Sequence, residues 1–94
     1  IPKDINLHQN FPNPFNPTTT IQYELNRESL VNITIYDLMG TEIVQLVNQI
    51  ETPGEKHIVW NGKDSAGKIV NAGVYLYKLQ SANSVQTKKM MLLK

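Results

Sequence analysis

Residues 21–35 read IQYELNRESLVNITI and contain two segments in which apolar and polar side chains alternate. In the first segment, Ile21, Tyr23 and Leu25 are separated by single polar residues. In the second, residues 31–35, the apolar positions hold Val, Ile and Ile. A period of two places the apolar side chains of a β-strand on one face and the polar side chains on the other. The stretch therefore predicts two strands that each present one face to a core.

Strand and turn signals continue along the rest of the chain. Gly, Pro, Asn and Asp mark turns at residues 36–40, 53–54, 61–67, 71–73 and 82–84. Further β-rich segments lie at residues 43–47, 57–60, 74–79 and 85–93. The first of these is a more continuous apolar stretch, which indicates either a twisted strand or one buried on both faces. About seven short strands at a spacing of roughly 8–12 residues predict an all-β protein, an Ig-like or fibronectin-III-like antiparallel β-sandwich.

Three prolines lie within residues 11–17, which read FPNPFNP and which we call the proline segment. Each proline fixes φ, removes a backbone donor and moves the residue before it out of the helical region. We therefore expect a stiff, extended segment that does not pair along a sheet through its own N–H groups. We expect Asn13 and Asn16 to bond the nearby backbone. Residues 1–17 then form a leading linker of a single domain that spans residues 1–94.

Length and composition describe one small globular domain. The chain has 94 residues, of which 40% are hydrophobic and 18% charged, and this balance separates it from disordered sequences. No apolar run approaches the roughly 20 residues that a membrane-spanning helix needs, and residues 1–10 lack the layout of a secretory signal. Cysteine is absent, which excludes disulfides, zinc fingers and thiol catalysis.

Charge is distributed unevenly along the chain. Residues 1–62 hold three basic and seven acidic side chains, whereas residues 63–94 hold six lysines and one acidic residue, Asp64. A basic final third raises the question of nucleic acid. The chain has a single arginine, however, and its lysines are spread over several predicted strands and turns. We interpret the lysines as a solvated, mildly basic face and predict no nucleic-acid partner.

Few residues suggest chemistry. His8 and His57 lie far apart in the sequence, and no serine stands in a nucleophile motif. His57 lies beside apolar residues in a predicted strand, which indicates a hydrogen-bonded structural histidine. Asn61, Asp64 and Asn71 offer oxygen ligands around a glycine-containing turn, but one carboxylate is too few for a calcium site. We expect these side chains to bond the local backbone, and we predict no enzyme activity, metal or cofactor.

The aromatic residues leave a second interpretation open. Exposed, coplanar rings would form a platform for a polysaccharide, whereas buried rings would belong to the core. We interpret Trp60 as a core residue of the sandwich. The remaining candidates for such a platform are Tyr23, Tyr36, Tyr75 and Tyr77.

Four blocks of the sequence carry a specific resemblance. They are residues 11–21, 35–40, 73–77 and 87–90, which read FPNPFNPTTTI, IYDLMG, GVYLY and TKKM. On these blocks the chain resembles the C-terminal sorting domain of type IX secretion substrates in diderm bacteria. Residues 59–75 are also similar to the Ig-like domain of the flagellar hook-capping protein, although Asn61 stands where that domain usually has Asp.

The resemblance implies a folded address at the end of a larger secreted protein. In that family the domain is recognised in the periplasm by the outer-membrane translocon and is commonly removed by a sortase-like peptidase. The N-terminally fused cargo is then secreted or attached to lipopolysaccharide at the cell surface. The positions that match the family's N-terminal motif are Pro12, Asn13 and Pro14. Those expected to be recognised by the translocon are Gly73, Tyr75, Lys88, Lys89, Met90, Leu92 and Lys94.

The last predicted strand gives this expectation a physical basis. Lys88 and Lys89 precede the apolar residues 90–93, so that charge protects an adhesive edge to which a partner strand can add. If this strand docks in the sandwich, its removal unfolds the domain. We expect the isolated domain to be a monomer or a weak dimer through an edge strand. The alternatives to a sorting domain are a polysaccharide-binding module and a passive Ig-like spacer of a secreted enzyme.

Overall fold

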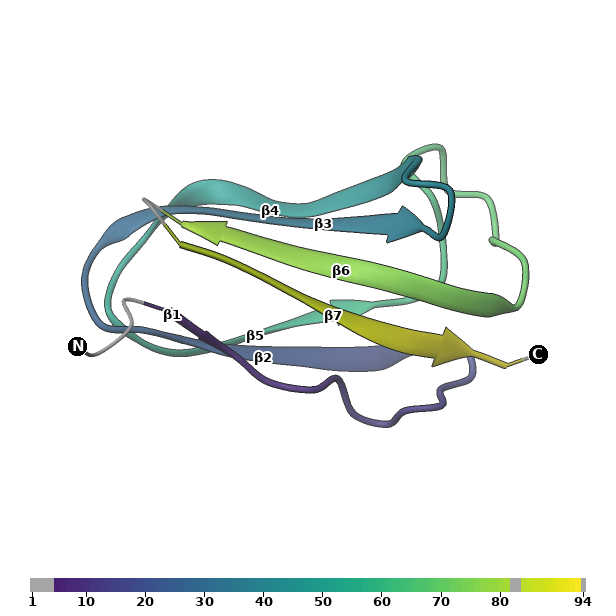
Figure 1. The fold of residues 1–94 in the computed structure, drawn as a ribbon, viewed down its shortest axis with the longest axis horizontal. Helices are drawn as coiled ribbons and strands as arrows, with labels where there is room; N and C mark the ends of the chain where they lie inside the picture. Colours follow the sequence, from purple (N-terminus) through teal and green to yellow (C-terminus); the bar gives the residue numbers. More distant parts are fainter. Residues whose placement is uncertain (1–4, 82–83, 94) are drawn as a thin grey trace.

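The computed structural model describes residues 5–81 and 84–93, and it forms a sandwich of two antiparallel sheets (Figure 1). The strands are β1 (Ile5–Leu7), β2 (Thr19–Leu25), β3 (Ser29–Asp37), β4 (Glu42–Glu51), β5 (Gly54–Trp60), β6 (Gly73–Ser81) and β7 (Ser84–Leu92). One sheet has the strand order β1-β2-β5 and the other β4-β3-β6-β7. The predicted all-β sandwich is confirmed, and the described residues contain no helix that is long and apolar enough to cross a membrane.

The alternating residues of β2 and β3 form the centre of the core. Six side chains point inward and are each at most 3% exposed, namely Ile21, Tyr23 and Leu25 of β2 and Val31, Ile33 and Ile35 of β3. Burying one such side chain contributes roughly 1.5–3 kcal/mol to stability. Trp60 is 1% exposed, which confirms that it is a core residue. The alternation predicted from the sequence therefore fixes which face of each sheet turns inward.

The strand β4 lies at one edge of the four-stranded sheet, beside β3. Val47 is buried, whereas Ile43, Val44 and Leu46 are partly buried against the core. Two register shifts interrupt the pairing of β4 with β3, and such bulges increase the twist of an edge strand. Residues 43–47 therefore belong to a twisted strand, and the alternative of a strand buried on both faces is wrong.

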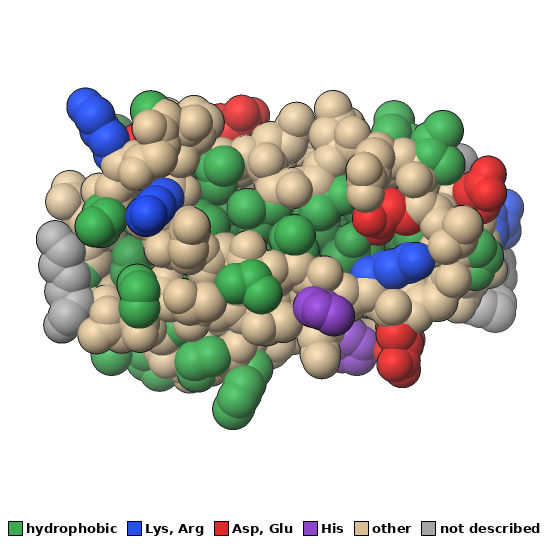
Figure 2. Space-filling model, turned by 180° about the vertical axis from the view of Figure 1, so that it is seen from behind, with side chains coloured by type: hydrophobic (Ala, Val, Ile, Leu, Met, Phe, Trp, Pro, Cys, Tyr) green, Lys and Arg blue, Asp and Glu red, His purple; other side chains and the backbone are tan. Residues whose placement is uncertain are grey.

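The two sheets leave the sandwich open between their edge strands β4 and β5. Seen from behind, hydrophobic side chains lie at the bottom of a hollow that runs along the molecule (Figure 2). Partly buried residues on this side include Leu46 of β4 and Ile58 of β5. At one end, Tyr23 Oη donates a hydrogen bond of 2.6 Å to Glu51 Oε1 across the two sheets. This open side lies opposite the edge that β1 and β7 form.

The turns hold their shape through short-range hydrogen bonds. In the turn after β3, Asp37 Oδ1 accepts hydrogen bonds from Met39 N–H and Thr41 N–H, each of 2.9 Å. Such bonds are the usual reason for Asp at this place in a turn. Ser81 and Ser84 pair at the ends of β6 and β7, and residues 82–83 of the turn predicted between them lie outside the described residues.

Candidate recognition surface along the last strand

The proline segment lies along the outer edge of β7. Phe15 N–H donates to the Met91 carbonyl at 2.9 Å and Leu93 N–H donates to the Phe15 carbonyl at 2.8 Å, which makes a short parallel bridge. Phe11 also exchanges two backbone hydrogen bonds with Thr20 of β2. The prediction that the segment does not pair through its own N–H groups is therefore wrong. Proline removes the donor only at its own position, so Phe11 and Phe15 keep theirs.

Asn13 fastens the proline segment to the last strand. Its Oδ1 accepts a hydrogen bond of 3.0 Å from Met91 N–H, 78 positions along the chain. The prediction of local bonding is thus wrong for Asn13. It is also wrong for Asn16, which is exposed and makes no side-chain hydrogen bond to a described residue. Asn10 takes the local role instead, since its Nδ2 donates to the Pro12 carbonyl at 3.2 Å.

Tyr77 of β6 holds the chain just before the proline segment. Its Oη accepts a hydrogen bond from Asn10 N–H and donates one to the His8 carbonyl, both of 2.8 Å. Burial of the side chain raises the pKa of Tyr77 to about 12, while the bond from Asn10 acts in the opposite direction. The sequence marks Tyr77 as a candidate aromatic ring and as part of the block at residues 73–77, without a role in holding the chain. The one signal that could have found this role is a tyrosine at an inward position of a strand.

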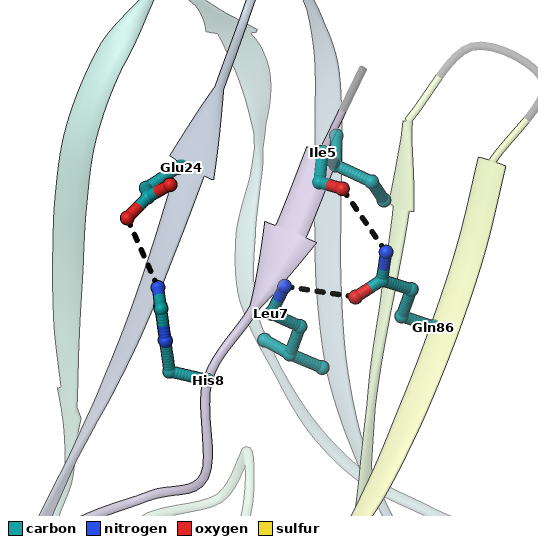
Figure 3. Close-up of polar contacts among 5 residues, drawn as sticks. All are labelled: Ile5, Leu7, His8, Glu24 and Gln86. Carbon is teal, nitrogen blue, oxygen red and sulfur yellow. Dashed lines mark hydrogen bonds and ion pairs between the residues drawn. The ribbon is translucent and has the colours of Figure 1, made fainter. Parts of the chain in front are cut away.

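Two glutamine side chains continue this attachment along β7. Gln86 Oε1 accepts from Leu7 N–H at 2.8 Å and Gln86 Nε2 donates to the Ile5 carbonyl at 3.0 Å, so the amide takes the place of a neighbouring strand (Figure 3). Gln9 Nε2 donates to the Lys89 carbonyl at 2.8 Å. The bond of Gln9 and those of the proline segment occupy backbone groups along the outer edge of β7, whereas the bonds of Gln86 occupy backbone groups of β1.

Phe15 and Gly62 fix the path of the proline segment. Phe15 is 1% exposed, and its ring packs against Trp60 with the ring centroids 5.7 Å apart. Gly62 has a φ of 75°, and a Cβ added there would lie 3.1 Å from the Pro17 carbonyl oxygen. Glycine therefore allows both a left-handed backbone and a close approach of two segments. Sequence reasoning placed Gly62 in a loop and missed this contact.

The predicted recognition residues are divided between the core and the surface. Tyr75, Met90 and Leu92 are buried, so they pack inside the folded domain and are not displayed to a partner. Lys88 shares the inward phase of Met90 and is half-buried, whereas Lys89 is exposed. The sequence pattern does not separate the side chains of this strand that pack from those that are displayed.

The remaining predicted positions lie around the same edge. Gly73 begins β6, where it pairs with the end of β7, and Lys94 lies outside the described residues. The two prolines that flank Asn13 are exposed. Sequence reasoning missed Met91 and Leu93, which are 42% and 47% exposed. The sequence does not distinguish them from their buried neighbours, because residues 90–93 are all apolar.

A shallow hollow, which we call the tail hollow, lies where three of the four sequence blocks meet. It is lined by Asn13 of the proline segment, Val74 of β6, and Lys89, Met90 and Met91 of β7. Val74 and Met91 are paired neighbours on adjacent strands, so their side chains share the outer face of the sheet. Residues far apart in the sequence thus form one surface.

The charged side chain among the residues that line the tail hollow is Lys89. Neither Lys88 nor Lys89 forms an ion pair with a residue that the structure describes. Asp64, the one acidic residue after position 62, accepts hydrogen bonds of 2.9 Å from Ala66 N–H and Lys68 N–H. This confirms the loop-holding role predicted for Asp64, and it leaves the positive charge of β7 without a nearby carboxylate from its own third of the chain.

The histidines lie on the other sheet. His57 is exposed on β5, so its interpretation as a structural histidine is wrong, because Ile58 takes the inward phase. His8 Nε2 lies 3.1 Å from Glu24 Oε1, and both side chains are partly exposed (Figure 3). Within the part of the chain that the structure describes, no three His, Asp or Glu side chains are placed to hold a metal ion.

Comparison with known proteins assigns a family to this arrangement. Residues 9–93 match the family described as the secretion system C-terminal sorting domain. The chain belongs to that family. A comparison with curated proteins finds no match.

Solved structures share the fold of this sorting domain. PorU from Porphyromonas gingivalis, described as dimeric and latent, is 22% identical with a TM-score of 0.75 over 95% of this chain and 9% of its own. PorZ, described as an essential surface component of the type IX secretion system of that bacterium, is 20% identical with a TM-score of 0.68 over 94% of this chain and 11% of its own. FlgD from Xanthomonas campestris, a flagellar hook-capping protein, is 21% identical with a TM-score of 0.63 over 97% of this chain and 63% of its own. The sorting domain thus spans a small part of the first two, and these similarities establish the Ig-like fold.

The sorting domain buries most of the rings that a polysaccharide platform would need. Tyr36 is partly exposed, but Lys78 Nζ lies 5.1 Å from the centre of its ring. The other candidate rings are buried in the core, namely those of Tyr23, Trp60, Tyr75 and Tyr77. The aromatic residues therefore act mainly in packing.

Proposed function

We propose that this domain is a non-catalytic address that directs a larger cargo protein through the type IX outer-membrane translocon. The domain is recognised in the periplasm and removed by a sortase-like peptidase, and the cargo is then secreted or attached to the cell surface. The family match supports the sorting role. The similarity in fold to PorZ, a component of the type IX system, is consistent with it.

The observation that carries the proposal is the hydrogen bond between Asn13 and Met91. It joins the N-terminal motif of the family to the last strand, so that two distant motifs contribute to one surface. A signal that is read from a folded domain has to be a fixed surface. The backbone bonds between Phe15 and β7 hold this one in place.

We assign direct contact with the translocon to the displayed residues of the last strand, Lys89, Met91 and Leu93. The buried and half-buried positions support this display by packing, because they set the position of β7 on the core. These supporting positions are Gly73, Tyr75, Lys88, Met90 and Leu92.

A secretion assay tests the proposal. Residues 1–94 are fused to the C-terminus of an inert reporter with a periplasmic signal peptide, in a bacterium with a type IX system and in the same strain without the translocon. Reporter outside the cell in the complete strain alone supports the sorting role. Reporter retained in the periplasm of both strains, with the fused domain shown to be folded, refutes it. Removing the last strand is a poor control, because Met90 and Leu92 belong to the core.

A further inference from the structure

The tail hollow combines apolar lining residues with one cation. Val74 and Met91 give it apolar walls, and Lys89 lies at its rim. Asn13 contributes to the same lining, and its side chain is held by its bond to Met91 N–H. Because the Asn13 side chain is already held, binding next to it carries no further entropic cost for ordering that side chain.

Backbone pairing with a partner is blocked at this place. Met91 N–H and its carbonyl are bonded to Asn13 and Phe15, and the Lys89 carbonyl accepts from Gln9. A partner strand would have to displace the proline segment before it could add to this part of β7. Recognition of the intact domain at the end of β7 therefore goes through side chains rather than through strand addition.

Charge defines the chemistry that fits the tail hollow. Lys88 and Lys89 have no carboxylate partner among the described residues, and the acidic residue of this third of the chain is engaged in its own loop. Complementary charge across an interface selects partners and accelerates their encounter. An apolar hollow with an unpaired cation at its rim thus fits an apolar side chain that stands beside a carboxylate.

We propose that the tail hollow receives an apolar side chain from an acidic segment of a protein of the export machinery, and that Lys89 pairs with a carboxylate next to that side chain. The inference rests on the proposed sorting function and specifies its partner.

The test uses the reporter fusion in the complete strain. Lys89→Glu reverses the charge at the rim, and Met91→Ser removes an apolar wall. Two control variants make the same chemical changes away from the hollow: Lys68→Glu in an exposed loop and Val85→Ser at the far end of β7. We expect the first pair to lower secretion roughly tenfold and the controls to stay within about twofold of the parent, with similar melting temperatures for all variants.

Lys89→Arg should retain secretion, because it keeps the positive charge. If the parent fusion is secreted and both Lys89→Glu and Met91→Ser are secreted at the same level, the inference is overturned while the sorting function stands. If the parent fusion itself is not secreted, the sorting function fails. Vesicles of purified lipopolysaccharide distinguish a lipid partner: binding by the parent domain that Lys89→Glu abolishes would overturn the choice of an acidic protein segment.

Discussion

Replacing Tyr77 with Phe should destabilise the domain by removing a single oxygen from its core. The ring is fully buried and keeps its packing. Its hydroxyl accepts from Asn10 N–H and donates to the His8 carbonyl, both at 2.8 Å. Leaving a buried N–H without an acceptor costs about 1–3 kcal/mol, and losing the second hydrogen bond costs about 1 kcal/mol more. We therefore expect a loss of about 2–4 kcal/mol.

The expected loss translates into a clear change in melting temperature. At about 2.1 cal/mol/K for each residue, a domain of this length has an unfolding entropy near 0.2 kcal/mol/K, so the melting temperature should fall by about 10–20 °C. Circular dichroism and calorimetry measure this shift. Tyr75→Phe is the matched control, because the Tyr75 hydroxyl makes one hydrogen bond, to the Asn71 carbonyl. It should lower the melting temperature by roughly 5 °C.

Two results for these variants would show that the Tyr77 hydroxyl has no special role. If the melting temperature of Tyr77→Phe is within about 3 °C of the parent, the hydroxyl of Tyr77 does not anchor the chain before the proline segment. The same conclusion follows if Tyr75→Phe lowers the melting temperature as much as Tyr77→Phe does. Amide hydrogen exchange adds a local readout. Exchange at Asn10 should accelerate in Tyr77→Phe and stay unchanged in Tyr75→Phe.

Three further predictions concern the same edge and the core beneath it. Gly62→Ala should lower the free energy of unfolding, measured by urea denaturation, by about 1 kcal/mol more than Gly67→Ala does. Both glycines have a positive φ, but only at Gly62 does the added Cβ approach another segment. Equal losses in the two variants would contradict this close approach. Asn13→Ala should lower the free energy of unfolding by about 1 kcal/mol. It should also accelerate hydrogen exchange at Met91 N–H, which donates to Asn13 Oδ1. An unchanged exchange rate at Met91 would show that this bond is not formed in solution. The contribution of Tyr77 to the free energy of unfolding should be complete below about pH 10 and should be lost between about pH 10 and 12. The reason is that an unfolded tyrosine has a pKa near 10, while burial raises the pKa of Tyr77 to about 12. The loss of stability with pH should be shallower in Tyr77→Phe, and identical curves of stability against pH for parent and variant would refute this.

The arrangement of the core could be predicted from the sequence because it depends on local alternation. Ile21, Tyr23 and Leu25 are separated by polar residues, so only one phase buries the apolar face. The last strand gives no such guidance. Because residues 90–93 are all apolar, either alternate set of side chains could face the core. The structure selects the phase that buries Met90 and Leu92, which turns Lys88 inward and leaves the next residues exposed.

The candidate site escaped prediction because its contacts join distant parts of the chain. Asn13 meets a residue 78 positions away, and nothing in its neighbourhood indicates that partner. The prediction for His57 was wrong for a related reason. Both residues after it are apolar, so the sequence does not show which side chains of this strand face the core. The resemblance to a family located the two motifs, and only the fold shows that they touch.

The parallel bridge between Phe15 and Leu92 also determines how the domain bears force. When the two ends of the chain are pulled apart, the two bridged segments are drawn in opposite directions along their own length. The hydrogen bonds of Phe15 to Met91 and Leu93 run across that direction, so they are loaded together in shear rather than opened one at a time. Resistance to pulling is then set by the barrier to unfolding rather than by equilibrium stability. The contacts that hold the proline segment on β7 therefore also act as a mechanical latch between the N-terminal and C-terminal segments of the domain.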